Sequence, residues 1–174
     1  MTALAKPDHL IVGIDPGPTT GVCGLRYSAA GQLIGGPVTV QCSINVAMVV
    51  LRAVINSCSR NAHGRIMPVR IAVENFVVGS RASRLTSPQG AKATRELIEA
   101  IRGLADDDIS VITRTAVQVK PWATDERISA AGLYQCTRGM GHARDAGRHA
   151  LFAACCDLRV PDPMAKHVKK VTTA

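Results

Sequence analysis

Two short apolar runs in this chain each end in a carboxylic acid, and this feature limits the folds open to it. Residues 10–14 lead into Asp15, and residues 69–73 lead into Glu74. A third acid, Asp145, stands near the start of an alanine-rich stretch with helical spacing. Burying a carboxylate is costly unless it is paired or bound to a cation. If the two strand ends and the helix converge, the three acids suggest a site for a hard metal ion.

The rest of the pattern predicts an α/β chain. Strands are predicted over residues 9–14, 21–27, 33–41, 67–73 and 109–113. Helices are predicted over residues 43–61, 88–105, 124–133 and 142–158, the first of them capped by Ser43. The order of the main elements, β-β-β-α-β-α-β-α, indicates a mixed five-stranded sheet with helices on both faces. The first and fourth strands are expected to lie side by side, so that Asp15 and Glu74 meet.

Length and composition bound the class of protein. The 174 residues favour a single domain with its own core, with flexible tails at residues 1–8 and 161–174. The formal net charge of +8 favours an acidic polymer such as nucleic acid as the partner. The six cysteines form no Cys-x-x-Cys pair, which argues against a zinc ribbon. Without a signal-peptide pattern or a membrane-spanning stretch, we expect a reduced, cytoplasmic protein.

Three segments of the chain carry a resemblance to a known family. They are Ile11-Val12-Gly13-Ile14-Asp15-Pro16-Gly17, Ile71-Ala72-Val73-Glu74-Asn75-Phe76 and His142-Ala143-Arg144-Asp145-Ala146. Each segment alone is a weak motif, but their order, spacing and expected elements agree with the family together. The chain resembles the RuvC-type Holliday-junction resolvases of the RNase H-like superfamily, over about residues 9–158. More narrowly, it is similar to the shortened RuvC-like resolvases carried by bacteriophages. The resemblance implies a single RNase H-like nuclease domain over residues 1–174.

The resemblance also implies a catalytic centre with two divalent ions, Mg²⁺ or Mn²⁺. Asp15 would bridge both ions, Glu74 would hold one of them, and Asp145 would hold the other. His142, one helical turn before Asp145, stands where the family has an acid or a histidine, and would join the ligands. Two ions about 3.5–4 Å apart stabilise the attacking and leaving oxygens of an in-line displacement. The implied enzyme is a crossover junction endodeoxyribonuclease whose products carry 5′-phosphate ends.

Several residues outside the acids are expected to contact DNA. The family has a lysine near the scissile phosphate, and Lys120 is expected in this role, as electrostatic support for the transition state. The family also stacks an aromatic ring on an unpaired base, for which Phe76 is the candidate. The remaining candidates are polar or basic residues that would bind phosphates: Ser80, Arg81, Arg84, Arg127, Arg144 and Arg148.

Each candidate also has a simpler interpretation. Asp15 would serve equally well in an Asx-turn, and Glu74 in an ion pair with an arginine. Asp145 would pair with Arg144, Arg148 or His149 on its own helix. A hydrogen-bonded histidine at a helix start would look the same as a ligand at position 142. The rings of Phe76 and Trp122 would fit a core role, Arg144 and Arg148 would also serve as solvated helix residues, and His149 is expected behind the ligands or facing DNA.

Three other functions compete with junction cleavage. The segment 15–21 resembles the first phosphate loop of actin- and hexokinase-like ATPases, but those need two such domains. RNase H-like nucleases that process pre-ribosomal RNA share the core and are usually smaller, and an inactive DNA-binding module would not need every acid. The sequence therefore favours a structure-selective endonuclease for four-way and other branched DNA. Because two symmetric nicks need two active sites, we expect a homodimer.

Overall fold

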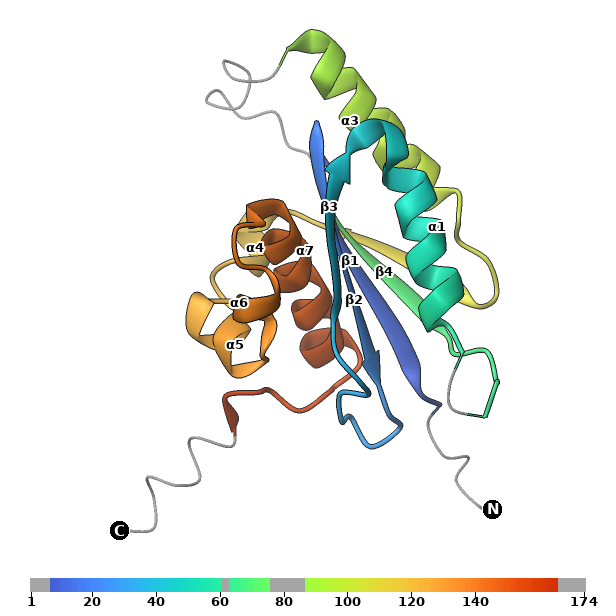
Figure 1. Ribbon diagram of the computed structural model, residues 1–174, viewed down its shortest axis with the longest axis vertical. Helices are drawn as coiled ribbons and strands as arrows, with labels where there is room; N and C mark the ends of the chain where they lie inside the picture. Colours follow the sequence, from blue (N-terminus) through green and yellow to red (C-terminus); the bar gives the residue numbers. More distant parts are fainter. Residues whose placement is uncertain (1–6, 61–62, 76–86, 166–174) are drawn as a thin grey trace.

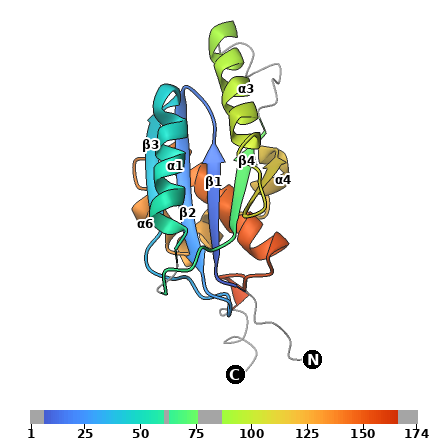
Figure 2. The same cartoon turned by 90° about the vertical axis from the view of Figure 1, so that its right-hand side faces the viewer.

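The protein is a three-layered α/β structure in which one sheet lies between two groups of helices. The computed structural model describes residues 7–60, 63–75 and 87–165. On one face lie α1 (Ala47–Cys58) and α3 (Pro88–Arg102), to the right of the sheet in Figure 1 and towards the viewer in Figure 2. The opposite face is covered by α4 (Ala116–Val119), α5 (Asp125–Ala130), α6 (Leu133–Cys136) and α7 (Gly141–Phe152). The expected mixed sheet with helices on both faces is confirmed.

The sheet has five strands in the order β3-β2-β1-β4-β5. Their bounds are β1 His9–Asp15, β2 Thr19–Tyr27, β3 Val38–Ser43, β4 Val69–Glu74 and β5 Ile109–Arg114. Strands β1, β4 and β5 run parallel, whereas β2 is antiparallel to both β1 and β3. Since parallel neighbours end at the same edge, Asp15 at the end of β1 and Glu74 at the end of β4 share that edge, as the sequence predicts.

The alternation of side chains along β1 divides the core in two. Leu10, Val12 and Ile14 belong to the apolar cluster beneath α1 and α3. Ile11 belongs to the second cluster, which α5, α6 and α7 cover. All four side chains are buried. Strand β1 is therefore the centre of both cores, and its last residue is held from two sides.

Helix α7 approaches the sheet so closely that two strand positions have no room for a side chain. An ideal Cβ at Gly13 in β1 would lie 1.9 Å from the carbonyl oxygen of Ala146. An ideal Cβ at Gly21 in β2 would lie 2.0 Å from the carbonyl oxygen of His142. Only glycine permits this contact of backbone with backbone, which places the helix directly over the ends of β1 and β2.

Both boundaries of β3 differ from the sequence-based expectation, because its pairing with β2 lies further along the chain than the apolar pattern indicates. Ser43 does not begin a long helix: it pairs with Thr19 as the last residue of β3. A single 3₁₀ turn follows, and α1 runs from Ala47 to Cys58. At its other end β3 begins at Val38, because Leu33 forms only an isolated bridge with Tyr27.

The helices also differ in detail. Helix α3 begins as expected: Ser87 accepts a hydrogen bond from the N–H of Gly90, and Pro88 occupies the first turn. Two helices that the sequence pattern did not indicate, α4 and α6, have four residues each. The last helix is regular up to Phe152 and continues as a π-helical turn, Ala153–Asp157.

Two contacts anchor the chain where the predicted tails begin. Asp8 accepts a hydrogen bond from the N–H of Ala29, at 2.9 Å. Asp162 forms an ion pair with Arg127, at 3.0 Å. None of the helices within the described residues has the length and apolar character needed to cross a membrane.

Candidate active site

The three acids come together at the carboxyl-terminal end of the central parallel strands β1 and β4. Asp15 and Glu74 end the adjacent parallel strands β1 and β4, whose register pairs Ile14 with Val73. Asp145 lies in the second turn of α7, which packs on the same strands through Gly13. The negative charges of Glu74 and Asp145 both act on Asp15. The structure therefore brings the three predicted acids within electrostatic reach of one another.

Asp15 is held by the histidine at the start of α7. The Nδ1 atom of His142 lies 2.7 Å from Oδ2 of Asp15. The backbone N–H of His142 donates to the side-chain oxygen of Gln41 in β3, at 3.2 Å. The Asp15 side chain is 14% exposed, whereas that of His142 is half exposed. The two residues predicted to share a site thus touch each other directly.

Burial makes Asp15 a weaker acid than usual. Removal from water raises its pKa to about 6; the hydrogen bond from His142 opposes this rise, and the charges of Glu74 and Asp145 add to it. At neutral pH the ionised Asp15 carboxylate is therefore an unfavourable buried negative charge. A cation bound beside it would stabilise that charge, and a carboxylate perturbed in this way is typical of a functional site such as a metal site.

Asp15→Asn is therefore expected to stabilise the protein at pH 8 in the absence of divalent ions, by up to about 3 kcal/mol. Because the pKa of Asp15 is about 6 in the folded protein and about 3.9 when unfolded, the folded state binds the extra proton between these values. Wild-type stability therefore falls as pH rises through that window. Urea unfolding should show Asp15→Asn to be more stable than wild type at pH 8, and this difference should disappear below about pH 4. Equal stability of the variant and wild type at pH 8 would contradict the idea that burial of ionised Asp15 is costly.

Asp145 is paired with two cations. Lys120 lies 2.9 Å from its Oδ2 atom, and Arg148, one turn further along α7, contacts its Oδ1 atom. Burial alone would raise the pKa of Asp145, but the hydrogen bond and charge of Lys120, together with Arg148, hold it below the usual value. Pairing of Asp145 with Arg148 was one of the simpler interpretations of the sequence, and it occurs in the structure.

Arg148 links this acid to the neighbouring helix. Its guanidinium also contacts Asp125 at the start of α5 and donates to the carbonyl oxygen of Ala123, at 3.1 Å. The side chain is 16% exposed. Arg148 therefore orients Asp145 from within the protein, and its binding of a DNA phosphate stays a prediction.

Glu74 is held by His149, which the sequence predicts behind the ligands or facing DNA; the buried side chain lies behind Glu74. The Nε2 atom of His149 lies 3.1 Å from Oε2 of Glu74. The partner is thus on α7, whereas the simpler interpretation of the sequence was an arginine. His142, Asp145 and His149 follow each other at spacings that place them on one helical face. That spacing was the available signal, but it does not identify which acid each residue meets.

The other predicted DNA-contact residues divide into two groups. Phe76, Ser80, Arg81 and Arg84 lie outside the described residues. Arg127 donates to Asp162 and to the carbonyl oxygen of Trp122, and it stacks 4.5 Å from the centre of the Trp122 ring. Arg144 stacks 4.5 Å from the centre of the Tyr134 ring and donates to Thr137. Their roles towards DNA stay predictions.

Trp122 belongs to a cluster of rings and arginines on the α7 side of the sheet. Its ring meets that of Phe152 edge-on, with 5.4 Å between the centroids. The Cζ atom of Arg114 lies 5.1 Å from the centre of the Phe152 ring, and Arg114 forms an ion pair with Asp157. These contacts favour the core role that the sequence allowed for Trp122.

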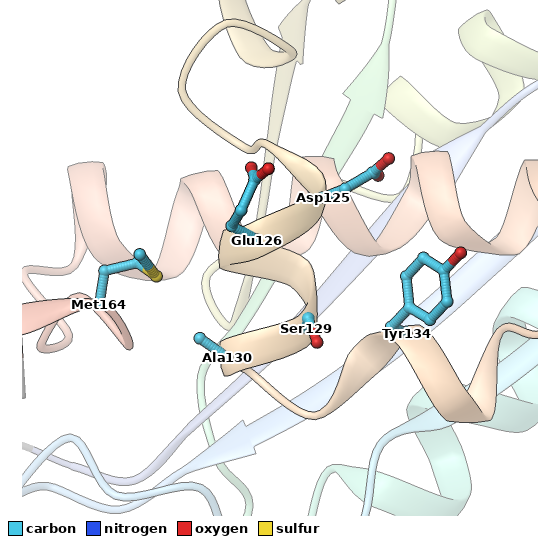
Figure 3. Close-up of a pocket in the computed structure, with 6 residues that line it drawn as sticks. All are labelled: Asp125, Glu126, Ser129, Ala130, Tyr134 and Met164. Carbon is cyan, nitrogen blue, oxygen red and sulfur yellow. The ribbon is translucent and has the colours of Figure 1, made fainter. Parts of the chain in front are cut away.

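A hollow of about 690 Å³ beside α5 is chemically different from the acid site. Figure 3 shows Asp125 and Glu126 on α5 and Tyr134 on α6, with Met164 at the other end. Ser129 and Ala130 complete the lining. Because two carboxylates line it, the hollow does not suit a phosphate backbone.

The donor set suits a divalent ion, although its oxygens are turned to internal partners. The three carboxylates supply the oxygen ligands that Mg²⁺ and Mn²⁺ prefer. Across residues 7–60, 63–75 and 87–165, no three histidine, cysteine or acidic side chains are arranged to hold an ion. In the contacts above, Lys120 and Arg148 occupy acceptor positions of Asp145, and His149 occupies one of Glu74. Ion binding at Asp145 would require at least Lys120 to leave it.

Comparison with known proteins supports the fold. No protein-family model and no curated protein sequence matches the chain. The structure of T. thermophilus RuvC in complex with a Holliday junction substrate matches with a TM-score of 0.50 and 15% identity, over 86% of this chain and 96% of that one. The inorganic polyphosphate/ATP-glucomannokinase of Arthrobacter sp. strain KM aligns with 76% of this chain and 50% of its own, at 17% identity and a TM-score of 0.37, which is too weak to support an inference. The protein therefore has a RuvC-like, RNase H-like fold.

Proposed function

We propose that the protein is a divalent-metal-dependent endonuclease that resolves four-way junctions and other branched DNA. The observation that carries the proposal is the convergence of Asp15, Glu74 and Asp145 at one edge of a RuvC-like sheet. The solved RuvC with this fold was bound to a Holliday junction. The net charge of +8 suits a phosphate backbone. Relation to the bacteriophage resolvases and a cytoplasmic location belong to the same proposal.

Asp15, Glu74, Asp145 and His142 would hold two Mg²⁺ or Mn²⁺ ions. When bound, such ions supply Lewis-acid stabilisation of the attacking and leaving oxygens in phosphodiester hydrolysis. The raised pKa of Asp15 supports this assignment, because its ionised form is unfavourable until a cation lies beside it. His142 keeps the Asp15 side chain oriented through the 2.7 Å contact.

Lys120 and Arg148 have separate tasks in this proposal. Lys120 is partly exposed and reaches Asp145 through a flexible stem, so it is free to move to a DNA phosphate. There its ammonium would stabilise the charge that builds up on the phosphate in the transition state. Arg148 is more deeply buried and is also held by Asp125 and Ala123, so it stays with Asp145 and orients that carboxylate.

A labelled four-way junction and a linear duplex of the same sequence test the function. With Mg²⁺ or Mn²⁺ we expect paired nicks in the junction that leave 5′-phosphate ends, and at least tenfold less cutting of the duplex, corresponding to about 1.4 kcal/mol of discrimination. Light scattering should give the mass of a homodimer, since two nicks require two sites. Equal cutting of junction and duplex would contradict structure selectivity.

The same assay separates the competing functions. A nuclease of the pre-ribosomal RNA type would cut an RNA strand in preference to the junction. An inactive binding module would shift the junction in a gel at every metal concentration without nicking it. Either result would replace the proposed function.

A further inference from the structure

His149 is a buried polar residue that no step of the proposed reaction yet uses. Its side chain is 1% exposed. Ala146 and Ala150, on the same helix, lie against Gly13 of β1 with their backbone atoms. This close approach of α7 brings the imidazole to Glu74 at the end of the next strand. A histidine so enclosed is a specific part of the packing, because burial of an unpaired ring nitrogen is costly.

The contact fixes one oxygen of the carboxylate. An ionised glutamate only accepts hydrogen bonds, so Nε2 of His149 carries the proton and donates it to Oε2 of Glu74 over 3.1 Å. A glutamate side chain has three rotatable bonds, and freezing them costs conformational entropy. A rigid donor beneath Glu74 removes this freedom in advance. A carboxylate has about four acceptor positions, so one hydrogen bond from His149 leaves capacity for a cation.

We propose that His149 is a positioning residue that holds Glu74 in the orientation required to bind a divalent ion. The proposal rests on the proposed function for its effect on DNA cleavage, but its effect on metal affinity stands separately. Hydrogen bonds to the outer atoms of metal ligands orient those ligands, and their loss typically weakens metal binding about 10–100-fold. The buried donor, its aim at Glu74 and the glycine contact that brings α7 close all support this role.

Mn²⁺ binding to the intact protein, measured by titration calorimetry, tests the proposal without DNA or cleavage. His149→Leu fills a similar volume without a donor, and we expect its Mn²⁺ affinity to fall about 10–100-fold. His149→Gln carries an N–H at a similar reach, and we expect it to retain affinity within about threefold of wild type. His149→Asn carries the same amide on a shorter side chain, and it should lose affinity as His149→Leu does.

Leu151→Ala is the matched control for general loosening of α7. Leu151 is buried on the same helix and belongs to the apolar core cluster beneath it. This variant should lose thermal stability but bind Mn²⁺ as wild type does. Wild-type affinity in His149→Leu, or equal affinity in the Gln and Asn variants, would overturn the proposal. So would a wild type that binds no Mn²⁺.

A second readout separates this proposal from the proposed function. If wild type binds Mn²⁺ and the Gln and Asn variants differ, but no junction is cut, the positioning role stands and the proposed nuclease function fails. If junctions are cut and the histidine variants bind Mn²⁺ as wild type does, the function stands and the positioning role fails.

Discussion

Asp145→Asn is expected to lose at least about 10²–10³-fold in junction nicking while still binding the junction. A bound metal ion contributes several kcal/mol to stabilisation of the transition state, and each 1.4 kcal/mol corresponds to a factor of ten in rate. Asparagine keeps the shape of the side chain but removes the negative charge that a divalent ion requires. Gel shift in the absence of divalent ions and single-turnover nicking in their presence measure the two effects separately.

This variant should still fold, because Arg148 keeps Asp125 as a partner and Lys120 is partly exposed, but it should lose some stability at neutral pH together with the charge pairing of Asp145. Asp162→Asn is the matched control: it makes the same change of charge in the ion pair with Arg127, at the C-terminal segment. We expect the control to nick the junction within about twofold of wild type, since Asp162 pairs with Arg127 and not with a residue of the acid site. Undiminished cutting by Asp145→Asn would contradict the proposed metal-binding role of Asp145. Loss of junction binding would show that Asp145 acts through the fold instead.

Gly21→Ala is expected to displace α7 and to disable the site from a distance. A methyl group there would lie 2.0 Å from the carbonyl oxygen and 2.2 Å from the carbonyl carbon of His142, so the helix must move. Overpacking typically lowers the free energy of unfolding by about 1–3 kcal/mol, and we expect a clash with backbone atoms to cost at least the upper value. A shift of about 1 Å in a catalytic group can reduce activity about 10²-fold. Urea unfolding and junction nicking should therefore both be impaired.

Gly141→Ala provides the control on the same helix, one residue before His142. Nothing within the described residues lies within 4 Å of a Cβ at this position. Alanine is the better helix former, by up to about 1 kcal/mol, so this variant should be as stable as wild type or slightly more stable. Wild-type stability and activity in Gly21→Ala would show that α7 does not need its present distance from the sheet.

The sequence identified the acids because each one ends a pattern that local physics determines. Asp15 and Glu74 follow apolar runs typical of buried strands, and parallel strands must end at a common edge. The resemblance to the RuvC-type family then implied that Asp145 joins them. The neighbouring positions of β1 and β4 and the helices on both faces followed from the order of the elements.

The partners of the acids were not predictable in the same way. His142 meets Asp15 across 127 positions and His149 meets Glu74 across 75, and no local pattern specifies such a pair. The two strand glycines, Gly13 and Gly21, did carry a usable signal. Glycine inside a strand pattern marks a close backbone approach, although none of the sequence-based expectations placed α7 on these strands. Helices α4 and α6 were not predicted, because four residues are too few to show the spacing of apolar residues typical of a helix.

The contact of α7 with two glycines also ties assembly of the acid site to the completion of folding. The last regular helix supplies His142 and Asp145, while the first strand supplies Asp15, so the site requires a contact between residues 127 positions apart. Contacts of this kind form late, because closing a long loop has an entropic cost before any contact repays it. A nascent or partly unfolded chain would therefore carry separated acids and no assembled site. Under the proposed function, the protein would stay inert towards DNA until its final helix docks.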